Sequence, residues 1–298
     1  MSPELVVLGN LLVDDLVFED GRTRMAEPGG AALHAALGAS LWGLPTGIVS
    51  WRGEDYPASA LAALAARGVD LAGVHDLGRP GVRVWLLYEG RRRQLLHRLE
   101  RPSHTEVSPT IAEIPPPWRG ARAFHLAPMP FETQAGLVGS LPENAFVSID
   151  PHLPLAPDTL SAWLRLLSRV DVVFVGEDEM ALPGAREDPR AVIRGLRGGR
   201  LRFVVLKRGG RGGILYDAHE DRFLEWAARA ESVVDPTGAG DAFAGGFLAG
   251  RLVHDDLEAA SRRGVVAASF ALEDWGAAGL LAATRDQAEE RRREWARP

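Results

Sequence analysis

The chain has 298 residues, 46% of them hydrophobic, which is enough to bury the core of one large domain with at most a small appendage. A net charge of −6 at pH 7 excludes the basic stripe of a nucleic-acid-binding protein, so we expect no nucleic-acid partner. No apolar run reaches the roughly 18 residues of a bilayer span and no signal-peptide pattern is present, so we expect no membrane association and a cytoplasmic location. The absence of cysteine excludes disulfides and thiol chemistry.

The first half of the chain begins a regular alternation. Residues 5–8 form a short apolar run followed by Gly9 and Asn10, which predicts a buried strand whose carboxyl end opens toward a site. Leucines recur at helical spacing over residues 31–44, so a helix is expected there. A strand over 46–50 and a helix over 57–67 follow.

The same rhythm continues in the second half. Strands are expected near residues 145–149, 171–175 and 203–206, with helices over 159–167 and 189–196 between them. Strands that alternate with helices in this way form a parallel sheet with helices on both faces. The fold class is therefore α/β.

Residues 81–98 interrupt the alternation. Val82, Val84, Leu86 and Tyr88 recur with a period of two, a turn follows at 89–91, and residues 94–97 return. The pattern predicts a β-hairpin inserted in the α/β chain, and an ordinary surface hairpin is the alternative.

The C-terminal segment, residues 284–295, has the pattern of an amphipathic, arginine-rich helix. We expect its run Arg291, Arg292, Arg293 to form a solvated face and not a binding patch.

Residues 235–247, DPTGAGDAFAGGF, join a glycine turn to the start of an apolar helix. A helix N-terminus carries unpaired N–H groups and the positive end of the helix dipole, so it can hold a phosphoryl group. Asp241, in the first turn of that helix, would face the acceptor and take the proton from its hydroxyl. The plainer interpretation is a tight turn followed by a capping aspartate.

The longer string at residues 235–250 resembles the second signature of the ribokinase family of carbohydrate kinases, also called the PfkB family. The resemblance implies a ribokinase-like fold, with a mostly parallel central sheet flanked by helices on both faces and a small β-sheet lid. It implies one domain over residues 1–298, with lid segments near 16–27 and 81–98. It also implies that Asp241 is the catalytic base and that the backbone of Gly238, Ala239 and Gly240 forms the anion hole.

The N-terminal part of the chain resembles the acceptor site of the family. Asp14 matches the aspartate that binds substrate hydroxyls, although Asp15 beside it leaves the register open by one residue. Gly29 and Gly30 match the two glycines that approach the substrate. His34 stands where the family has asparagine, so a polar contact survives but the family's selectivity does not transfer.

The second half resembles the nucleotide site. Lys207, Gly209 and Gly212 match a nucleotide-binding turn, Thr237 belongs to the anion turn, and Glu179 matches the glutamate that helps to place Mg²⁺. A glycine replaces the family's asparagine at 176. The Walker pattern GxxxxGK[ST] is absent, so glycine turns and metal would hold the nucleotide.

The resemblance implies an ATP-dependent phosphotransferase acting on a hydroxyl of a small sugar, sugar derivative or polyol. A nucleoside or inositol kinase and a non-catalytic ligand-binding homologue are the alternatives. The implied cofactors are ATP and Mg²⁺, with a monovalent cation as a further candidate. We expect a small polyhydroxylated substrate and either a monomer or a homodimer.

Overall fold

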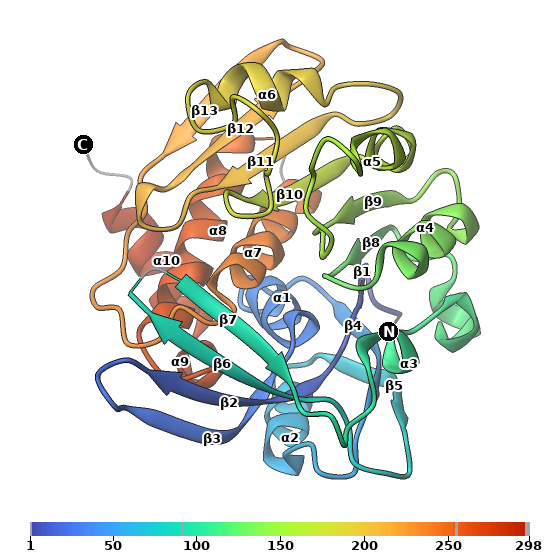
Figure 1. Ribbon diagram of the computed structural model, residues 1–298, viewed down its shortest axis with the longest axis vertical. Helices are drawn as coiled ribbons and strands as arrows, with labels where there is room; N and C mark the ends of the chain where they lie inside the picture. The colour runs from blue at the N-terminus through green and yellow to red at the C-terminus, as the bar shows by residue number, and fades with distance from the viewer. Residues whose placement is uncertain (1, 91, 254–255, 296–298) are drawn as a thin grey trace.

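The computed structural model describes residues 2–90, 92–253 and 256–295. Two sheets organise the chain (Figure 1). The larger is nine-stranded, in the order β13-β12-β11-β10-β9-β8-β1-β4-β5, and the smaller is four-stranded, in the order β3-β2-β6-β7. The larger sheet contains β1 (Leu5–Leu8), β4 (Thr46–Arg52), β5 (Asp70–Asp76), β8 (Ala123–Leu126), β9 (Phe146–Ile149), β10 (Val172–Gly176), β11 (Phe203–Lys207), β12 (Gly213–Asp217) and β13 (Arg222–Trp226).

The strands from β5 to β11 in this order are parallel, and β12 pairs antiparallel with both β11 and β13. Alternate side chains of β1 enter different cores, because successive residues of a strand point to opposite faces. Leu5 and Val7 pack in one hydrophobic cluster, and Val6 and Leu8 in another. The sheet is therefore buried on both faces, as predicted for an α/β chain.

Two groups of helices supply these faces. The first cluster receives side chains from α1 (Ala31–Ser40), α2 (Ala58–Ala66), α7 (Ala239–Val253), α8 (Leu257–Leu272), α9 (Ala278–Ala282) and α10 (Arg285–Glu294). The second receives side chains from α4 (Phe131–Ser140), α5 (Leu160–Leu167) and α6 (Pro189–Gly195). Short helical turns occur at α3 (His104–Val107), η1 (Ile111–Glu113), η2 (Pro116–Trp118) and η3 (Gly209–Arg211). Across the described ranges, no helix is both long and apolar enough to cross a bilayer.

The smaller sheet is the predicted lid. It consists of β2 (Leu12–Phe18), β3 (Thr23–Gly29), β6 (Arg83–Glu89) and β7 (Arg92–His97). Its inner face has a small core of its own, made by Leu12, Leu16, Val82, Val84, Leu86, Tyr88 and Val107. The first lid strand begins at Leu12 and not at residue 16, so only residues 9–11 separate it from β1. Arg91, part of the predicted hairpin turn, lies outside the described residues.

Two further expectations need correction. The helix predicted over 31–44 ends at Ser40, since residues 41–43 form a turn before β4. The predicted solvated arginine face includes Arg291, but this side chain lies over the ring of Phe270 at 3.9 Å and bonds to Glu273. The guanidinium thus links α10 to α8 and does not face solvent.

Candidate active site

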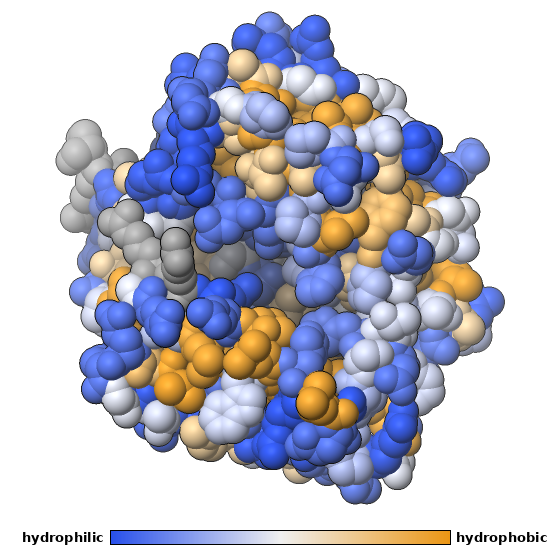
Figure 2. Space-filling view, viewed as in Figure 1, coloured by the Kyte–Doolittle hydropathy of each residue, from blue (hydrophilic) through white to orange (hydrophobic). Residues whose placement is uncertain are grey.

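The carboxyl ends of the parallel strands and the inner face of the lid border the same region. Asn10 follows β1, Asp150 follows β9, Gly176 ends β10 and Lys207 ends β11. The carboxyl edge of an open parallel sheet is where ligands bind in α/β proteins. Figure 2 shows this face of the molecule hollowed near its centre, above the lid strands.

The predicted anion turn precedes α7, and Asp241 lies in the first turn of this helix. Residues 238–241 are partly exposed, so their backbone and the Asp241 side chain are open to solvent. Helix α1 packs beside α7: a side chain at Gly38 would meet the carbonyl of Ala242, and one at Gly245 would meet that of Ala35. This close packing holds the first two turns of α7 against α1.

Gly238 is required at its position for two reasons. Its φ is +72°, in the left-handed region that favours glycine. A Cβ there would also lie 2.1 Å from the ring of His34. The predicted acceptor residue His34 therefore contacts the anion turn directly.

The His34 side chain is buried, and its Nδ1 lies 3.1 Å from the carbonyl oxygen of Gly30. A carbonyl only accepts, so Nδ1 donates, and Nε2 is an acceptor whenever it carries no proton. No protein group bonds to this Nε2 among the described residues. The ring can therefore accept one hydrogen bond from a ligand hydroxyl.

The lid strand β2 resolves the register between the two neighbouring aspartates. Asp14 shares the inner face with Leu12 and Leu16, and a side chain at Gly29 would overlap its carboxylate. Asp15 points the other way and accepts two hydrogen bonds of 2.7 Å from Arg83. Asp14 is thus the residue placed for a ligand, and Asp15 holds the lid strands together.

Asp14 lacks an internal partner. Its Oδ1 is buried with no hydrogen bond among the described residues. Burial raises the pKa of Asp14 to about 8, the charge of Arg93 opposes this, and Asp235, Asp15 and Asp241 add to it. An unsatisfied buried oxygen is costly, so a ligand hydroxyl that donates a hydrogen bond to it gains more than it would at an exposed site.

A chain of hydrogen bonds links the lid to the anion turn. The Tyr88 hydroxyl, on β6, lies 2.6 Å from Oγ1 of Thr237, which donates to Oδ1 of Asp235 at 2.6 Å. Because the Thr237 hydroxyl has one proton, Tyr88 must be the donor in the first bond. The other oxygen of Asp235 accepts from the N–H of Gly276 at 2.8 Å.

These hydrogen bonds change the interpretation of Thr237. Its backbone N–H also donates to Asp235, so both donors of this predicted nucleotide contact are used within the turn. The sequence did not single out Asp235 or Tyr88 as functional. The signal that could have identified Asp235 is the Asp-x-Thr spacing, which is typical of an aspartate whose side chain caps its own turn.

The only lysine in the sequence lies against the same turn. Lys207 forms a buried ion pair with Asp150, and a Cβ on Gly240 would lie 3.3 Å from its Nζ. Burial alone would lower the pKa of Lys207, but the charges of Asp150, Glu179 and Asp241 raise it above its usual value. The ammonium group is therefore a fixed positive charge beside the α7 N-terminus.

Glu179 lies close to this cluster. Its Oε2 accepts a hydrogen bond of 2.6 Å from the N–H of Gly176. A Cβ at 176 would lie 3.0 Å from the same oxygen, so the carboxylate occupies the side of the strand where the family carries an asparagine side chain. No group of three or more His, Asp or Glu side chains in the described ranges is arranged to hold a metal ion by itself.

The other two predicted nucleotide residues lie in the turn between β11 and β12. Gly209 begins η3, and Gly212 follows it with a φ of +78°. A side chain on Gly212 would overlap the carbonyl of Trp226, so this glycine also allows β13 to pack closely. The turn lies at the same end of the strands as Lys207.

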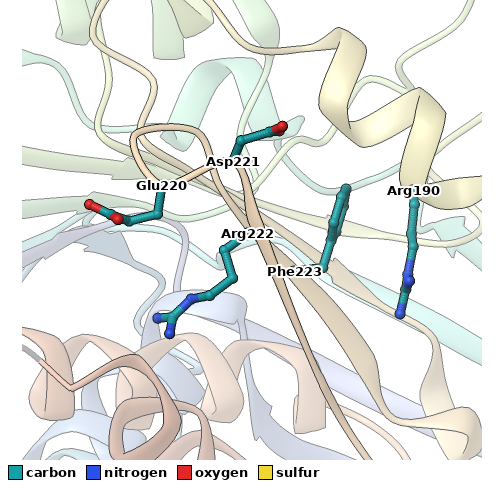
Figure 3. A pocket seen from close by; sticks show the side chains of 5 residues that line it. All are labelled: Arg190, Glu220, Asp221, Arg222 and Phe223. Atoms are coloured by element: carbon teal, nitrogen blue, oxygen red, sulfur yellow. The ribbon is translucent and has the colours of Figure 1, made fainter.

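A separate hollow of about 700 Å³ lies elsewhere (Figure 3). It is lined by Arg190, Glu220, Asp221, Arg222 and Phe223. In the β11–β12 register Phe203 pairs with Asp217 and Lys207 pairs with Gly213. The 218–221 turn therefore lies at the amino end of β11, at the opposite end of the strands from Lys207. The hollow is therefore not part of the site.

The site brings together a helix N-terminus, a carboxylate in its first turn, a partly buried lysine and the predicted acceptor aspartate of the lid, which are the kinds of group that phosphoryl transfer uses. Comparison with known proteins points to the same chemistry. Residues 143–283 match the model of the pfkB family of carbohydrate kinases. The chain is 35% identical to a cytidine kinase of Thermococcus kodakarensis over 278 residues, covering 92% of this chain and 97% of the relative. The chain belongs to the pfkB family of kinases, also called the ribokinase family.

Other relatives carry different names. A fructokinase of Escherichia coli is 28% identical over 84% of this chain and 85% of its own length. An Escherichia coli protein assigned as a ribokinase II, solved with ATP and Mg²⁺, superimposes with a TM-score of 0.79 at 21% identity, covering 99% of this chain and all of that one. This likeness confirms the predicted ribokinase-like fold.

Proposed function

We propose that the chain is an ATP-dependent kinase that phosphorylates a hydroxyl of a nucleoside, and that cytidine is the first acceptor to test. The observation that carries the phosphotransferase assignment is the position of Asp241 in the first turn of α7. The turn before it contacts His34 on the acceptor side at Gly238 and Lys207 of the larger sheet at Gly240. A carboxylate between an acceptor site and a phosphate site is where a general base is needed. The relative with 35% identity over almost its full length supports the choice of a nucleoside.

In the proposed reaction, Asp14 and Nε2 of His34 bind acceptor hydroxyls, and Gly29 and Gly30 line the acceptor. Asp241 accepts the proton of the reacting hydroxyl while that oxygen bonds to the γ-phosphorus. The bond to the β–γ bridging oxygen breaks and ADP leaves. The N–H groups of Gly238 and Gly240 stabilise the charge on the transferring group, whereas the N–H of Ala239, also predicted for this role, donates to the carbonyl of Pro236 at 3.4 Å.

We further propose that Lys207, Gly209 and Gly212 border the nucleotide phosphates and that Glu179 helps to hold Mg²⁺. One oxygen of Glu179 is used by the Gly176 amide, so one is left for a hydrated cation. A single protein carboxylate fits Mg²⁺, which keeps several waters and binds mainly to phosphate oxygens. When bound, the metal neutralises charge on the phosphates.

ADP formation by the purified protein tests the proposal. The acceptors are cytidine, uridine, adenosine, inosine, D-ribose and D-fructose, each with ATP and Mg²⁺. We expect turnover with at least one nucleoside and kcat/KM at least about 10-fold lower with the free sugars. Turnover with fructose alone would reassign the acceptor to a sugar, in line with the fructokinase relatives. No turnover with any acceptor would contradict the proposal.

A further inference from the structure

Three histidines from separate parts of the chain contact one another at the inner face of the lid. His97 ends β7, His104 begins α3, and His152 follows β9. The rings of His97 and His104 meet edge to face with centroids 4.7 Å apart, and those of His104 and His152 are 5.5 Å apart. We call these three residues the histidine cluster.

The strand register places the cluster relative to Asp14. Asp14 pairs with Val84 on the neighbouring strand, and Val84 pairs with His97 on the next. Asp14 and His97 therefore lie in one row across the lid, on the same face and two strand spacings, or about 10 Å, apart. A single sugar ring bound to Asp14 does not extend so far, whereas a sugar joined to a planar base does.

The cluster also belongs to the larger sheet. Asn10, directly after β1, donates to Oγ of Ser108, and this hydroxyl lies 2.7 Å from the carbonyl of His104. These bonds fix α3 to the end of β1. His152 follows Asp150, the partner of Lys207, by two residues, and its pKa responds to the charges of Glu179, His97 and Arg93, although burial is the main cause of its lowering. The cluster thus borders the candidate active site.

His104 has unused hydrogen-bonding capacity. Both of its ring nitrogens are buried, and neither has a partner among the described residues. The rings that contact it belong to His97 and His152, which are exposed residues, although part of the His152 side chain is buried. A neutral imidazole offers one donor and one acceptor, which matches the adjacent donor and acceptor groups on the edge of a nucleobase.

Charge favours a neutral ligand over an anionic one at His104. Burial, together with the neighbouring His97 and His152, lowers the pKa of His104 to about 4, so the ring is neutral at pH 7. Among the described residues, these three histidines do not form a group arranged to hold a metal ion.

We propose that His97, His104 and His152 form the subsite that binds the heterocyclic base of a nucleoside acceptor whose sugar is held by Asp14. This inference rests on the proposed nucleoside kinase function and adds the residues that select the base. His104 supplies the donor and the acceptor, His97 closes over the base from the lid, and His152 borders it on the side of the larger sheet.

The test is His104→Phe, which keeps the ring and its edge-to-face contact but removes both nitrogens. The matched control is His219→Phe, at an exposed position in the β12–β13 turn. We expect the KM for cytidine to rise at least about 10-fold in His104→Phe, because a buried partner of the base is lost, while the KM for ATP stays within about twofold. The control should leave both constants unchanged.

A purely structural role for His104 would alter the melting temperature and leave the KM for cytidine within about twofold of wild type, which would overturn the inference. If His104→Phe shows no cooperative melting transition, His152→Phe serves instead, with the same two outcomes. The wild-type acceptor panel separates the failures. Nucleoside turnover with an unchanged KM in the variant refutes the subsite alone, and turnover restricted to free sugars refutes both the subsite and the nucleoside assignment.

Discussion

The bond between Tyr88 and Thr237 gives the sharpest prediction, because it joins the lid to the anion turn at one pair of buried atoms. Tyr88→Phe removes only the hydroxyl and keeps the ring, which stacks on Phe18 at 4.7 Å. Losing one buried hydrogen bond should cost about 1 kcal/mol of unfolding free energy. For a chain of this size that lowers the melting temperature by about 2–4 °C.

The effect on turnover distinguishes positioning from stability. If this bond holds the turn that carries the Gly238–Gly240 amides, kcat should fall about 3- to 10-fold while the KM for the acceptor changes little, since the loss is felt mainly in the transition state. Tyr216→Phe is the matched control. Its buried hydroxyl donates to Asp221 at 2.8 Å, at the opposite edge of the larger sheet. We expect Tyr216→Phe to lose a similar amount of stability and to keep the wild-type kcat. An equal kcat in the two variants would refute the reasoning.

Three other substitutions test the site. Asp241→Asn should lower kcat by about 100-fold or more with an unchanged melting temperature, because the base is lost and the fold is not. Burial raises the pKa of Asp14 to about 8, so the native state keeps a proton that the unfolded chain has released, and wild-type stability should fall as the pH rises from about 4 to about 8. In Asp14→Asn that decline should be smaller, as followed by thermal melting across this range. Gly238→Ala should lose about 2 kcal/mol of stability or more and much of the activity, since it combines backbone strain with overlap of the His34 ring.

The substitutions of Asp14 and Gly238 each have a control in the same chain. Asp158→Asn, at an exposed position, should keep the wild-type dependence of melting temperature on pH. Gly78→Ala has a comparable φ of +63° but open space around it, so it should show the strain without the loss of activity. Identical pH profiles for wild type and Asp14→Asn would exclude Asp14 as the source, and full activity in Gly238→Ala would exclude a tightly fitted turn. A normal kcat in folded Asp241→Asn would remove Asp241 from the role of base.

Much of the architecture followed from local patterns. The apolar run at residues 5–8 and those ending at 149, 175 and 206 became β1, β9, β10 and β11, and the alternating residues 82–88 became part of β6 of the lid. These elements are buried on one or both faces, so their hydrophobic periodicity reports their structure directly. The β12–β13 hairpin was missed, because its glycine-rich start was read as a nucleotide turn alone.

The site was only partly predictable for a different reason. A motif identifies residues that lie together in sequence, such as 238–241, but partners across the fold carry no such pattern. Tyr88 and Thr237 are 149 positions apart, and Asp150 and Lys207 are 57 apart. The same limit explains Arg291, whose neighbours on α8 cannot be read from the periodicity of α10.

The division of the site between the two sheets has an evolutionary consequence. Asp14 and His97 are carried by the lid, whereas Asp241, Lys207 and Glu179 belong to the body of the molecule. Mutations that remodel the lid segments can therefore alter which alcohol is accepted without disturbing the apparatus that handles phosphate. A scaffold partitioned in this way can diversify its substrates while inheriting its chemistry intact, and grafting lid segments between relatives should transfer acceptor preference.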